Sequence, residues 1–303
     1  MRVLVTGGTG FVGRALIPKL LEQGHQAAVL TRSATHVSDF PPAVNLVRGD
    51  PARPGAWQDE AARCEAVINL AGSAIYRRWN GAEKKVIRDS RILTTRHLVQ
   101  ALSARRGKET VLLSASGVGY YGFTGEEELD ENGPAGADFL AGLSADWEKE
   151  ARVAESAGVR VALCRFGIVL GKGGGALGKM LPAFRLGLGS PLGSGRQWFP
   201  WIHLEDLVRV LLYLLEQREI SGPVNCTAPH PVRNLEFTRA LSKALRRPSF
   251  LPAVPGFALK AALGEFGNVL LQGQRAVPAR LLQHGFAFRF PEIDATLRDL
   301  LSS

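Results

Sequence analysis

The stretch that decides the fold is Thr6-Gly7-Gly8-Thr9-Gly10-Phe11-Val12-Gly13. It follows the apolar residues 3–5 and opens a segment, 11–23, whose apolar residues recur at helical spacing. A glycine turn between a strand and a helix brings unpaired N–H groups and the positive end of the helix dipole together, which suits a pyrophosphate. In this context the motif predicts a dinucleotide site, and we expect a positive φ at Gly10. The alternative is a glycine turn that binds no ligand. The cofactor-binding candidates here are Gly7, Thr9, Gly10, Phe11, Val12 and Gly13.

The rest of the first 165 residues alternates between strand-like and helix-like segments. The expected strands are 3–6, 26–31, 44–47, 66–70, 111–114 and 159–165, and the expected helices are 11–23, 83–104 and 144–157. These strands are continuously apolar, which is typical of a parallel sheet covered on both faces. The pattern predicts an α/β fold with a doubly wound parallel sheet.

The composition changes after residue 165, where glycines crowd 171–178 and 187–195. We expect a nucleotide-binding domain over 1–165, to which 196–228 returns, and a smaller C-terminal substrate lobe from 166–195 and 229–303. The first glycine cluster, which lies between the lobes, is interpreted as a flexible flap over the nicotinamide of a bound cofactor or as a second anion cradle.

Composition and charge narrow the function classes. Of the 303 residues, 46% are hydrophobic and 21% charged, which is typical of a globular protein. The net charge is +9, but the basic residues are dispersed, so we expect no nucleic-acid or membrane partner and favour an anionic small molecule. The three cysteines, Cys64, Cys164 and Cys226, lie far apart, which argues against a disulfide framework or metal site. Because the expected first strand begins at residue 3, we expect no signal peptide and a cytoplasmic protein.

The end of the second expected strand indicates which dinucleotide is bound. An NAD site usually carries an acidic residue there, but this chain has Thr31, Arg32 and Ser33, with no acidic residue between Gly24 and Ser38. An arginine makes charge-assisted bonds to a 2′-phosphate, with Thr31 adding a hydroxyl. We therefore expect NADP(H) rather than NAD, the alternative being that Arg32 is only a solvated residue.

Together these motifs resemble an atypical branch of the extended short-chain dehydrogenase/reductases, the YfcH-like epimerase-family proteins of the NAD-dependent epimerase/dehydratase superfamily. The resemblance covers nearly the whole chain. It is carried by the glycine motif, Leu30-Thr31-Arg32, Asn69-Leu70-Ala71-Gly72, Arg77-Arg78-Trp79-Asn80, Ser90-Arg91, Gly119-Tyr120-Tyr121-Gly122, Val169-Leu170-Gly171, Arg185-Leu186-Gly187-Leu188-Gly189, Phe199-Pro200-Trp201-Ile202-His203 and Gly273-Gln274-Arg275.

The resemblance implies an extended Rossmann-type fold, NADP(H) binding and a C-terminal substrate lobe. It also implies further cofactor contacts, some along the adenosine half and some near the nicotinamide. Arg91 stands where relatives face the cofactor, and could reach a phosphate or a substrate anion, or lie in solvent. The implied contacts are Asp50, Leu70, Ala71, Gly72, Arg91, Ser114, Arg165, Phe166 and Ile168.

The catalytic machinery departs from that of familiar reductases. None of the four tyrosines is followed four residues later by a lysine, so the usual Tyr-x-x-x-Lys pair is absent. Phe139 or Leu140 stands at the tyrosine position, and Leu143 or Ser144 at the lysine position. The catalytic candidates are Ser116, Tyr120 and Tyr121, the tyrosines being equally well explained by packing.

Three aromatic residues near the second glycine cluster complete the candidates. His203 is interpreted first as a structural hydrogen-bonding residue and second as an acid or base. Trp198 and Trp201, with Gln197, either line the substrate pocket or pack between the lobes. The sequence favours an NADP(H)-binding oxidoreductase or epimerase-like enzyme with a small anionic substrate. The alternative is a non-catalytic NADP(H)-binding sensor or partner-binding module.

Overall fold

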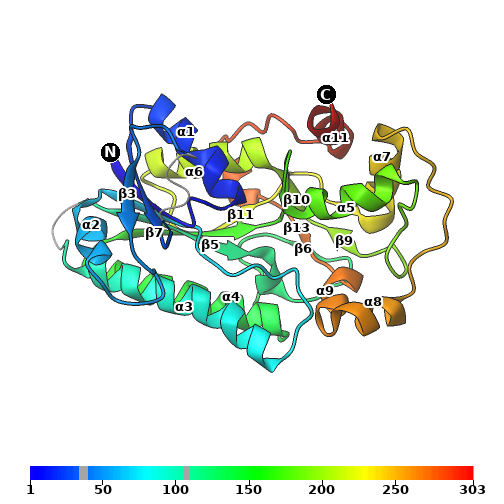
Figure 1. The fold of residues 1–303 in the computed structure, drawn as a ribbon, viewed down its shortest axis with the longest axis horizontal. Coiled ribbons are helices and arrows are strands. Elements are labelled where there is room, and N and C mark those ends of the chain that lie inside the picture. The colour runs from blue at the N-terminus through cyan, green and yellow to red at the C-terminus, as the bar shows by residue number, and fades with distance from the viewer. Residues whose placement is uncertain (34–39, 106–108, 303) are drawn as a thin grey trace.

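A seven-stranded parallel sheet forms the centre of the computed structural model, which describes residues 1–33, 40–105 and 109–302. The strand order is β11-β7-β5-β4-β1-β2-β3, and every neighbouring pair is parallel (Figure 1). The strands are β1 (Arg2–Thr6), β2 (Gln26–Thr31), β3 (Asn45–Arg48), β4 (Ala66–Asn69), β5 (Val111–Gly117), β7 (Arg160–Phe166) and β11 (Gly222–Cys226). This arrangement confirms the predicted doubly wound α/β fold.

Helices cover both faces of the sheet, as Figure 1 shows. On one face, α1 (Phe11–Glu22) and α6 (Leu204–Glu216) bury Leu16, Leu20, Leu207 and Leu211 against the strands. On the other face lie α2 (Trp57–Arg63), α3 (Gly81–Ser103), α4 (Phe139–Arg152) and the 3₁₀ turn η3 (Val153–Ala157). The strands therefore lie between two apolar layers, which explains their continuously apolar sequences.

Helix α2, helix α4 and strand β5 differ from the prediction, while the other strands and helices predicted over 1–165 agree within two residues. Helix α2 was not predicted, because seven residues are too few to show a clear helical period. Helix α4 begins at Phe139, five residues early, because the Asp138 side chain accepts hydrogen bonds from the N–H groups of Leu140 and Ala141. Strand β5 continues to Gly117, since it pairs with β7 along that whole length.

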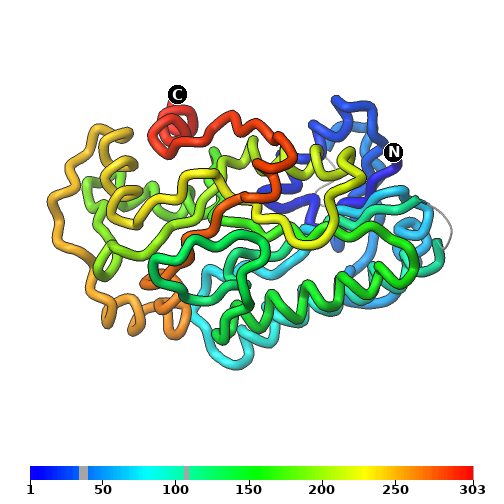
Figure 2. Tube along the Cα trace, turned by 180° about the vertical axis from the view of Figure 1, so that it is seen from behind, coloured from blue at the N-terminus to red at the C-terminus, as the bar shows by residue number. Residues whose placement is uncertain are grey.

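A second lobe extends from the carboxyl-terminal side of the sheet, and Figures 1 and 2 show it at the end farthest from the N-terminus. Its core includes Leu177, Phe184, Trp201, Phe237 and Leu297. Trp201 is fully buried there, so of the two tryptophans it is a core residue. The helices are α5 (Gly175–Arg185), α7 (Asn234–Ala244), α8 (Gly256–Leu263), α9 (Phe266–Leu271), α10 (Ala279–Gln283) and α11 (Ile293–Leu301).

Short two-stranded ladders connect the lobe to the sheet. They pair β8 (Ile168–Leu170) with β10 (Trp201–His203), β9 (Trp198–Phe199) with β12 (Val232–Arg233), and β6 (Glu128–Leu129) with β13 (Arg275–Ala276). Residues 222–226 form an edge strand of the central sheet, although they follow both glycine clusters in sequence. The proposed domain boundaries themselves stay a prediction. No helix within the described residues has the length and apolar character needed to cross a membrane.

Candidate functional site

The glycine motif forms a turn whose backbone is packed too tightly for side chains. Gly7 has φ +67°, and a Cβ there would lie 2.6 Å from the carbonyl oxygen of Leu70, at the end of β4. A Cβ on Gly13 would lie 2.5 Å from the Cα of Gly8. The expected positive φ at Gly10 is wrong, since Gly10 has φ −80° and the left-handed residue of the turn is Gly7. The turn thus lies between β1 and β4, where the strand order reverses.

The N-terminus of α1 meets the requirements of an anion site. Its N-cap is Gly10, no side chain caps it, and its first turn carries no acidic residue. Thr9 and Val12 are half-buried beside it. The free N–H groups and the closely approached glycine backbone together form a cradle of the kind that accepts a pyrophosphate.

The end of β2 carries the residues predicted to select the dinucleotide. The Thr31 hydroxyl donates to the Ser33 carbonyl oxygen at 3.0 Å. The Arg32 side chain is exposed next to it, and no partner for it is found among the described residues. Asp50, after β3, accepts from the Ala52 N–H at 3.1 Å. Arg32 is therefore free to meet an added anion.

Arg91 lies against the residues that follow β4. Its guanidinium donates to the carbonyl oxygens of Ser73 and Ile87 at 3.1 and 3.0 Å. A Cβ on Gly72 would lie 2.9 Å from its central carbon. Burial lowers the pKa of Arg91 to about 10. Ala71 is buried, and Leu70 is half-buried.

A buried charged network joins α4 to the ends of β5 and β7. Arg165 binds both carboxylate oxygens of Glu148, at 2.8 and 2.9 Å. Ser116 donates its hydroxyl to the same carboxylate at 2.8 Å. All three residues are at most 5% exposed. Glu148 thus connects two predicted site residues, Ser116 and Arg165. Arg165 in turn reaches a third, Tyr121.

Tyr121 connects this network to β11, the edge strand of the central sheet. Its hydroxyl accepts from Arg165 at 3.0 Å and donates to the Asn225 side-chain oxygen at 2.7 Å. Burial raises the pKa of Tyr121 to about 12. The carboxylate of Glu131 accepts from the N–H of Asn225, at 3.0 Å. Both sides of the Tyr121 hydroxyl are therefore occupied by the protein.

The remaining predicted residues lie around this network. The Tyr120 ring stacks on Arg165, whose guanidinium carbon is 3.5 Å from the ring centroid. Ser114 is buried, and its hydroxyl has no hydrogen-bond partner among the described residues. Phe166 and Ile168 are half-buried on either side of Gly167. Whether these residues contact a cofactor stays a prediction.

Helix α4 presents apolar groups where a Tyr–Lys pair is usual. Phe139 packs edge-on against Trp79 with ring centroids 5.2 Å apart, and Leu143 is buried in the same cluster. Leu140 lies against Gly119, where an added Cβ would come within 3.2 Å of it. This part of the helix therefore offers packing and no titratable group.

The first glycine cluster packs onto the nucleotide turn. A Cβ on Gly171, Gly174 or Gly175 would lie 2.6 to 2.7 Å from the ring of Phe11, the first residue of α1. Glycine is thus required by close approach to Phe11. This contact fits the interpretation of the cluster as a cover over the turn better than that of a separate anion cradle.

A second group of polar residues, which the sequence analysis left largely undescribed, surrounds Trp198. The guanidinium carbons of Arg233 and Arg275 lie 4.3 and 5.1 Å from the Trp198 ring. Arg233 pairs with Glu126 at 2.6 Å, and Arg275 with Glu128 at 3.1 Å. In the sequence, the Gly273-Gln274-Arg275 motif was the signal for this group. Glycine is needed at position 273 because a Cβ there would lie 2.0 Å from the Trp198 carbonyl oxygen.

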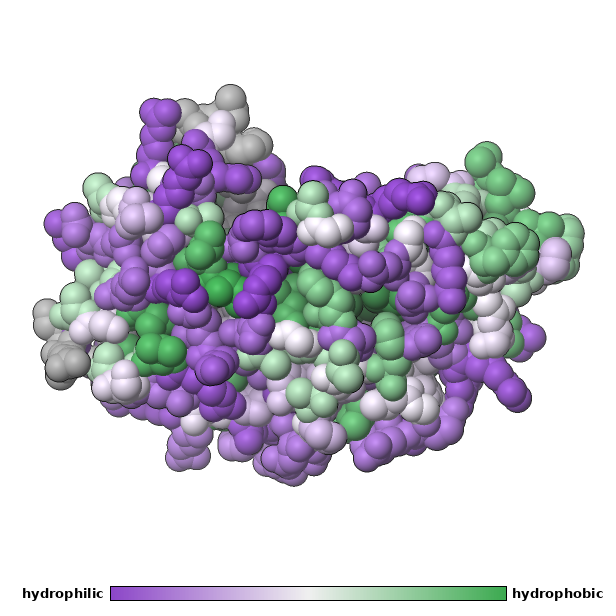
Figure 3. Space-filling model, turned by 90° about the horizontal axis from the view of Figure 1, so that it is seen from below, coloured by the Kyte–Doolittle hydropathy of each residue, from purple (hydrophilic) through white to green (hydrophobic). Residues whose placement is uncertain are grey.

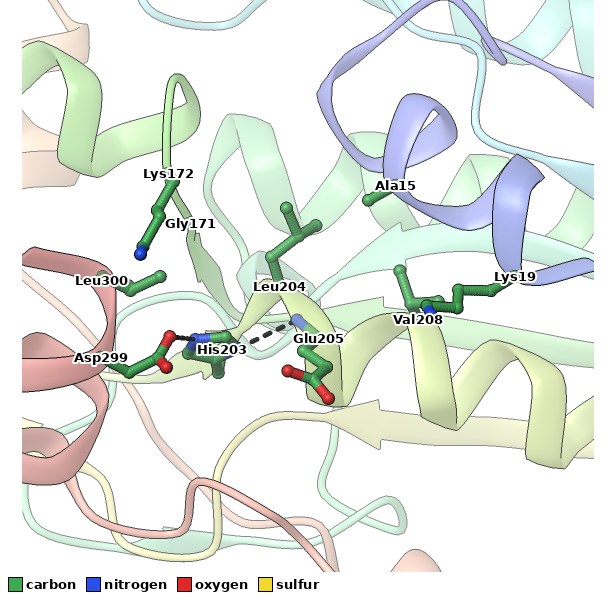
Figure 4. Close-up of a pocket in the computed structure, with 10 residues that line it drawn as sticks. All are labelled: Ala15, Lys19, Gly171, Lys172, His203, Leu204, Glu205, Val208, Asp299 and Leu300. Carbon is green, nitrogen blue, oxygen red and sulfur yellow. Dashed lines mark hydrogen bonds and ion pairs between the residues drawn. The ribbon is translucent and has the colours of Figure 1, made fainter. Parts of the chain in front are cut away.

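His203 has a structural role in a separate surface pocket of about 350 Å³ (Figure 4). Its Nδ1 accepts from the N–H of Glu205 and caps α6, and its Nε2 lies 3.2 Å from the Asp299 carboxylate on α11. Its ring stacks on Phe290. Both nitrogens are occupied, which agrees with the first interpretation of this residue.

No cluster of metal-ligating side chains occurs within 1–33, 40–105 and 109–302. The three cysteines are free and buried.

Comparison with known proteins gives a consistent result. Residues 3–226 match the model of the NAD dependent epimerase/dehydratase family, and residues 254–300 match DUF1731, a domain of unknown function. A chloroplastic SDR39U1 homologue of Arabidopsis thaliana is 44% identical, over 99% of this chain and 87% of that protein. YfhF of Bacillus subtilis is 36% identical, over 100% of this chain and 98% of that protein.

Solved structures agree with the sequence matches. Human SDR39U1 (isoform2), crystallised with NADPH, has a TM-score of 0.86 and 37% identity, with 99% of each chain covered. The UDP-glucose 4-epimerase of Thermus thermophilus, in complex with NAD, has a TM-score of 0.78 at 21% identity, with 99% of this chain and 97% of that chain covered. The second match supports the fold alone.

Replacing Glu148 is expected to destabilise the protein strongly. Glu148→Leu leaves Arg165 buried without its carboxylate, so we expect a loss of about 3–5 kcal/mol in the free energy of unfolding. Urea denaturation measures it. The control is Glu150→Leu on the same helix as Glu148. It removes a partly exposed ion pair with Arg96 of α3 and is expected to cost about 1 kcal/mol or less. Equal losses in the two variants would contradict the prediction.

Acid is expected to destabilise the protein through His203. Burial lowers the pKa of His203, so between the folded pKa and the unfolded value of about 6.5 the unfolded chain binds more protons. The contribution of His203 to the free energy of unfolding is fully present above a pH of about 6.5. It is lost as the pH falls from there through the folded pKa. Since Asn can also cap α6, His203→Asn should flatten this part of the stability–pH curve, measured by urea denaturation. The exposed-residue control, His284→Asn, should keep the slope; an unchanged slope in His203→Asn would refute the assignment.

Proposed function

The chain belongs to the NAD dependent epimerase/dehydratase family, and from that premise we propose that it is an NADP(H)-dependent oxidoreductase or epimerase-like enzyme with a small anionic substrate. The cofactor, when bound, supplies or takes up hydride. The chain's own residues bind and orient the two ligands at the carboxyl edge of the sheet. The glycine turn beside the uncapped N-terminus of α1 is the observation that carries this proposal.

NADP(H) fits the residues at this edge. The turn from Gly7 to Gly13 holds the pyrophosphate, because its backbone leaves no room for side chains and offers free N–H groups. Arg32 holds the 2′-phosphate, since it is exposed and without a partner among the described residues. The NADPH in the structure of the human relative supports the same choice.

The anionic substrate is assigned to the residues around Trp198. Arg233 and Arg275 flank its ring, and the Nε of Arg275 is buried without a hydrogen-bond partner among the described residues. The carboxylates of Glu126 and Glu128 now lie on these arginines. A substrate carboxylate or phosphate is of the same chemistry and would take their place.

Ser116 is the proposed oxygen-binding residue. Glu148 accepts a hydrogen bond from the Ser116 hydroxyl, so the hydroxyl oxygen keeps its lone pairs and has a defined direction. Tyr120 is the proposed proton-carrying phenol of the two, because its hydroxyl makes no hydrogen bond among the described residues while that of Tyr121 is fully bonded.

One observation favours a second function, a non-catalytic NADP(H) sensor. The burial that raises the pKa of Tyr121 to about 12 makes this phenol a poor base at neutral pH. The position of α4 where a lysine would lower such a pKa carries Leu143 or Ser144, and the helix has its lysine, Lys149, only in the last turn. A sensor needs the glycine cradle and Arg32 but neither Ser116 nor the arginines at Trp198. We place either form in the cytoplasm, where free, buried cysteines are ordinary.

Arg32 is expected to set the cofactor preference. A charge-assisted bond to the 2′-phosphate contributes about 1.5–3 kcal/mol, so NADPH should bind roughly ten- to a hundred-fold more tightly than NADH. Titration calorimetry measures both affinities. Arg32→Ala should remove the preference, and Arg53→Ala, which changes another exposed arginine of the same domain, should keep it. Equal affinities in the unaltered protein would end this assignment.

Turnover is expected with anionic carbonyl compounds or sugar nucleotides. The test follows NADPH absorbance, and epimerisation by product analysis, against matched anionic and neutral compounds. With an active compound, Arg275→Gln should raise KM about ten-fold or more while NADPH affinity stays within a few-fold, because a charged hydrogen bond is lost. Ser116→Ala should lower kcat.

The control for both variants is Arg218→Gln, which changes an exposed arginine paired with an exposed glutamate. If no compound of the panel reacts while NADPH binds tightly, the sensor function is favoured.

A further inference from the structure

The end of the second lobe carries an unusual surface. Its apolar side chains are widely exposed, namely Leu186 at 75%, Leu188 at 57%, Phe250 at 80% and Phe257 at 77%. Helix α8, which carries Phe257, has no buried residue at all. Figure 3 shows hydrophobic residues gathered at one end of the molecule, the end that carries the 246–256 segment in Figure 1. Such a concentration marks an interaction site.

The segments that bear these side chains lie side by side. A Cβ on Gly187 would lie 3.7 Å from Pro248. This contact places the end of α5 beside the segment that follows α7. The Val254 N–H donates to the Pro191 carbonyl oxygen at 2.8 Å. Leu192 and Val254 form an isolated bridge just before α8. The four exposed side chains therefore belong to one continuous end.

The charge of this end has one sign. Residues 172–204 and 237–264 contain nine basic residues and no acidic residue, against a net charge of +9 for the whole chain. Four of the basic residues stand next to the exposed apolar ones: Arg185 before Leu186, Arg246 and Arg247 before Phe250, and Lys260 one turn after Phe257. All four are exposed, and none pairs with a carboxylate within the described part of the chain. We name these four with the four apolar side chains the cationic apolar end.

We propose that the cationic apolar end docks on the surface of an anionic lipid bilayer. Phenylalanine and leucine enter the headgroup region while the neighbouring arginines and lysine bind lipid phosphates, as in surface-lying membrane proteins. A second copy of the chain would bring the same unpaired cations together, which charge repulsion opposes. The four apolar side chains are each 57–80% exposed, and a fluid headgroup region accommodates such protruding side chains without the shaped surface that an acidic protein would need.

This inference departs from the expectation that no membrane partner exists. That expectation rested on the dispersal of basic residues along the sequence. The fold brings residues 185–192 and 246–260, which are parts of the two acid-free segments, together at one end, and neither the cofactor turn nor the arginines at Trp198 belong to that end. The inference is therefore independent of the proposed function.

The test is co-sedimentation of the full chain with vesicles. We expect binding to phosphatidylcholine vesicles that contain phosphatidylglycerol, little binding to phosphatidylcholine alone, and release at high salt. Phe250→Ser with Phe257→Ser should weaken binding at least about ten-fold, because two apolar side chains are lost. Arg246→Glu with Arg247→Glu should weaken it more than about twenty-fold, since each cation contributes about five-fold.

Matched controls place the effect at this end. Val153→Ser with Leu282→Ser changes apolar side chains that are 53% and 49% exposed elsewhere. Arg53→Glu with Arg218→Glu makes the same charge change with arginines that are 84% and 77% exposed. Both controls should bind anionic vesicles like the unaltered protein.

Three results would overturn the proposal. The first is no binding to anionic vesicles, and the second is an equal loss of binding in the control variants. The third is that light scattering shows a dimer of the unaltered protein and of the controls, while the variant with Phe250→Ser and Phe257→Ser is a monomer. The last would assign this end to a second copy. Failure to bind vesicles by a monomer would leave an acidic protein as the occupant.

Discussion

The structure depends on one steric constraint, the contact of the Gly7 backbone with the end of β4. The chain leaves β1 in the left-handed conformation and passes so close to Leu70 that no Cβ fits. Gly13 meets Gly8 in the same way, so α1 starts immediately and returns over the sheet. Because β2 lies on one side of β1 and β4 on the other, the turn opens a crevice at the carboxyl edge. The N–H groups that this geometry leaves free are those that a pyrophosphate needs.

A buried ion pair determines how the rest of the site is arranged around that crevice. Arg165 and Glu148 would be costly to bury apart, and together they hold α4 against β5 and β7. Through Tyr121 and Asn225 the same network reaches β11, and Glu131 continues it to α10 by accepting from the Arg280 N–H. Ser116 takes its direction from Glu148. The hydroxyl proposed for catalysis is thus held by a network that also joins the two lobes.

The two lobes have different surfaces because their charges are distributed differently. In the first lobe, exposed arginines such as Arg96 and Arg88 face acidic partners on α4. In the second lobe, long segments without acidic residues leave cations unpaired beside exposed phenylalanines. Ion pairs of the first kind contribute little to stability. Unpaired cations of the second kind remain available to an external anion.

The order of the main strands and helices of the first 165 residues and the nucleotide turn could be predicted from the sequence, because both depend on interactions between neighbouring residues. Continuous apolar strands, helical periodicity and the glycine spacing are properties of neighbouring residues, and they predicted the doubly wound sheet and its crevice. Arg32 was found in the same way, by its distance along the chain from the glycines. Which residues work together over long separations depends on the tertiary fold. The fold brought Glu148 to Ser116 and Arg165, placed Arg233 and Arg275 on Trp198, buried Trp201 in a core, and joined residues 185–192 to residues 246–260 at one end. These outcomes depend on burial and on pairing between distant residues, and the spacing of residues along a chain contains neither.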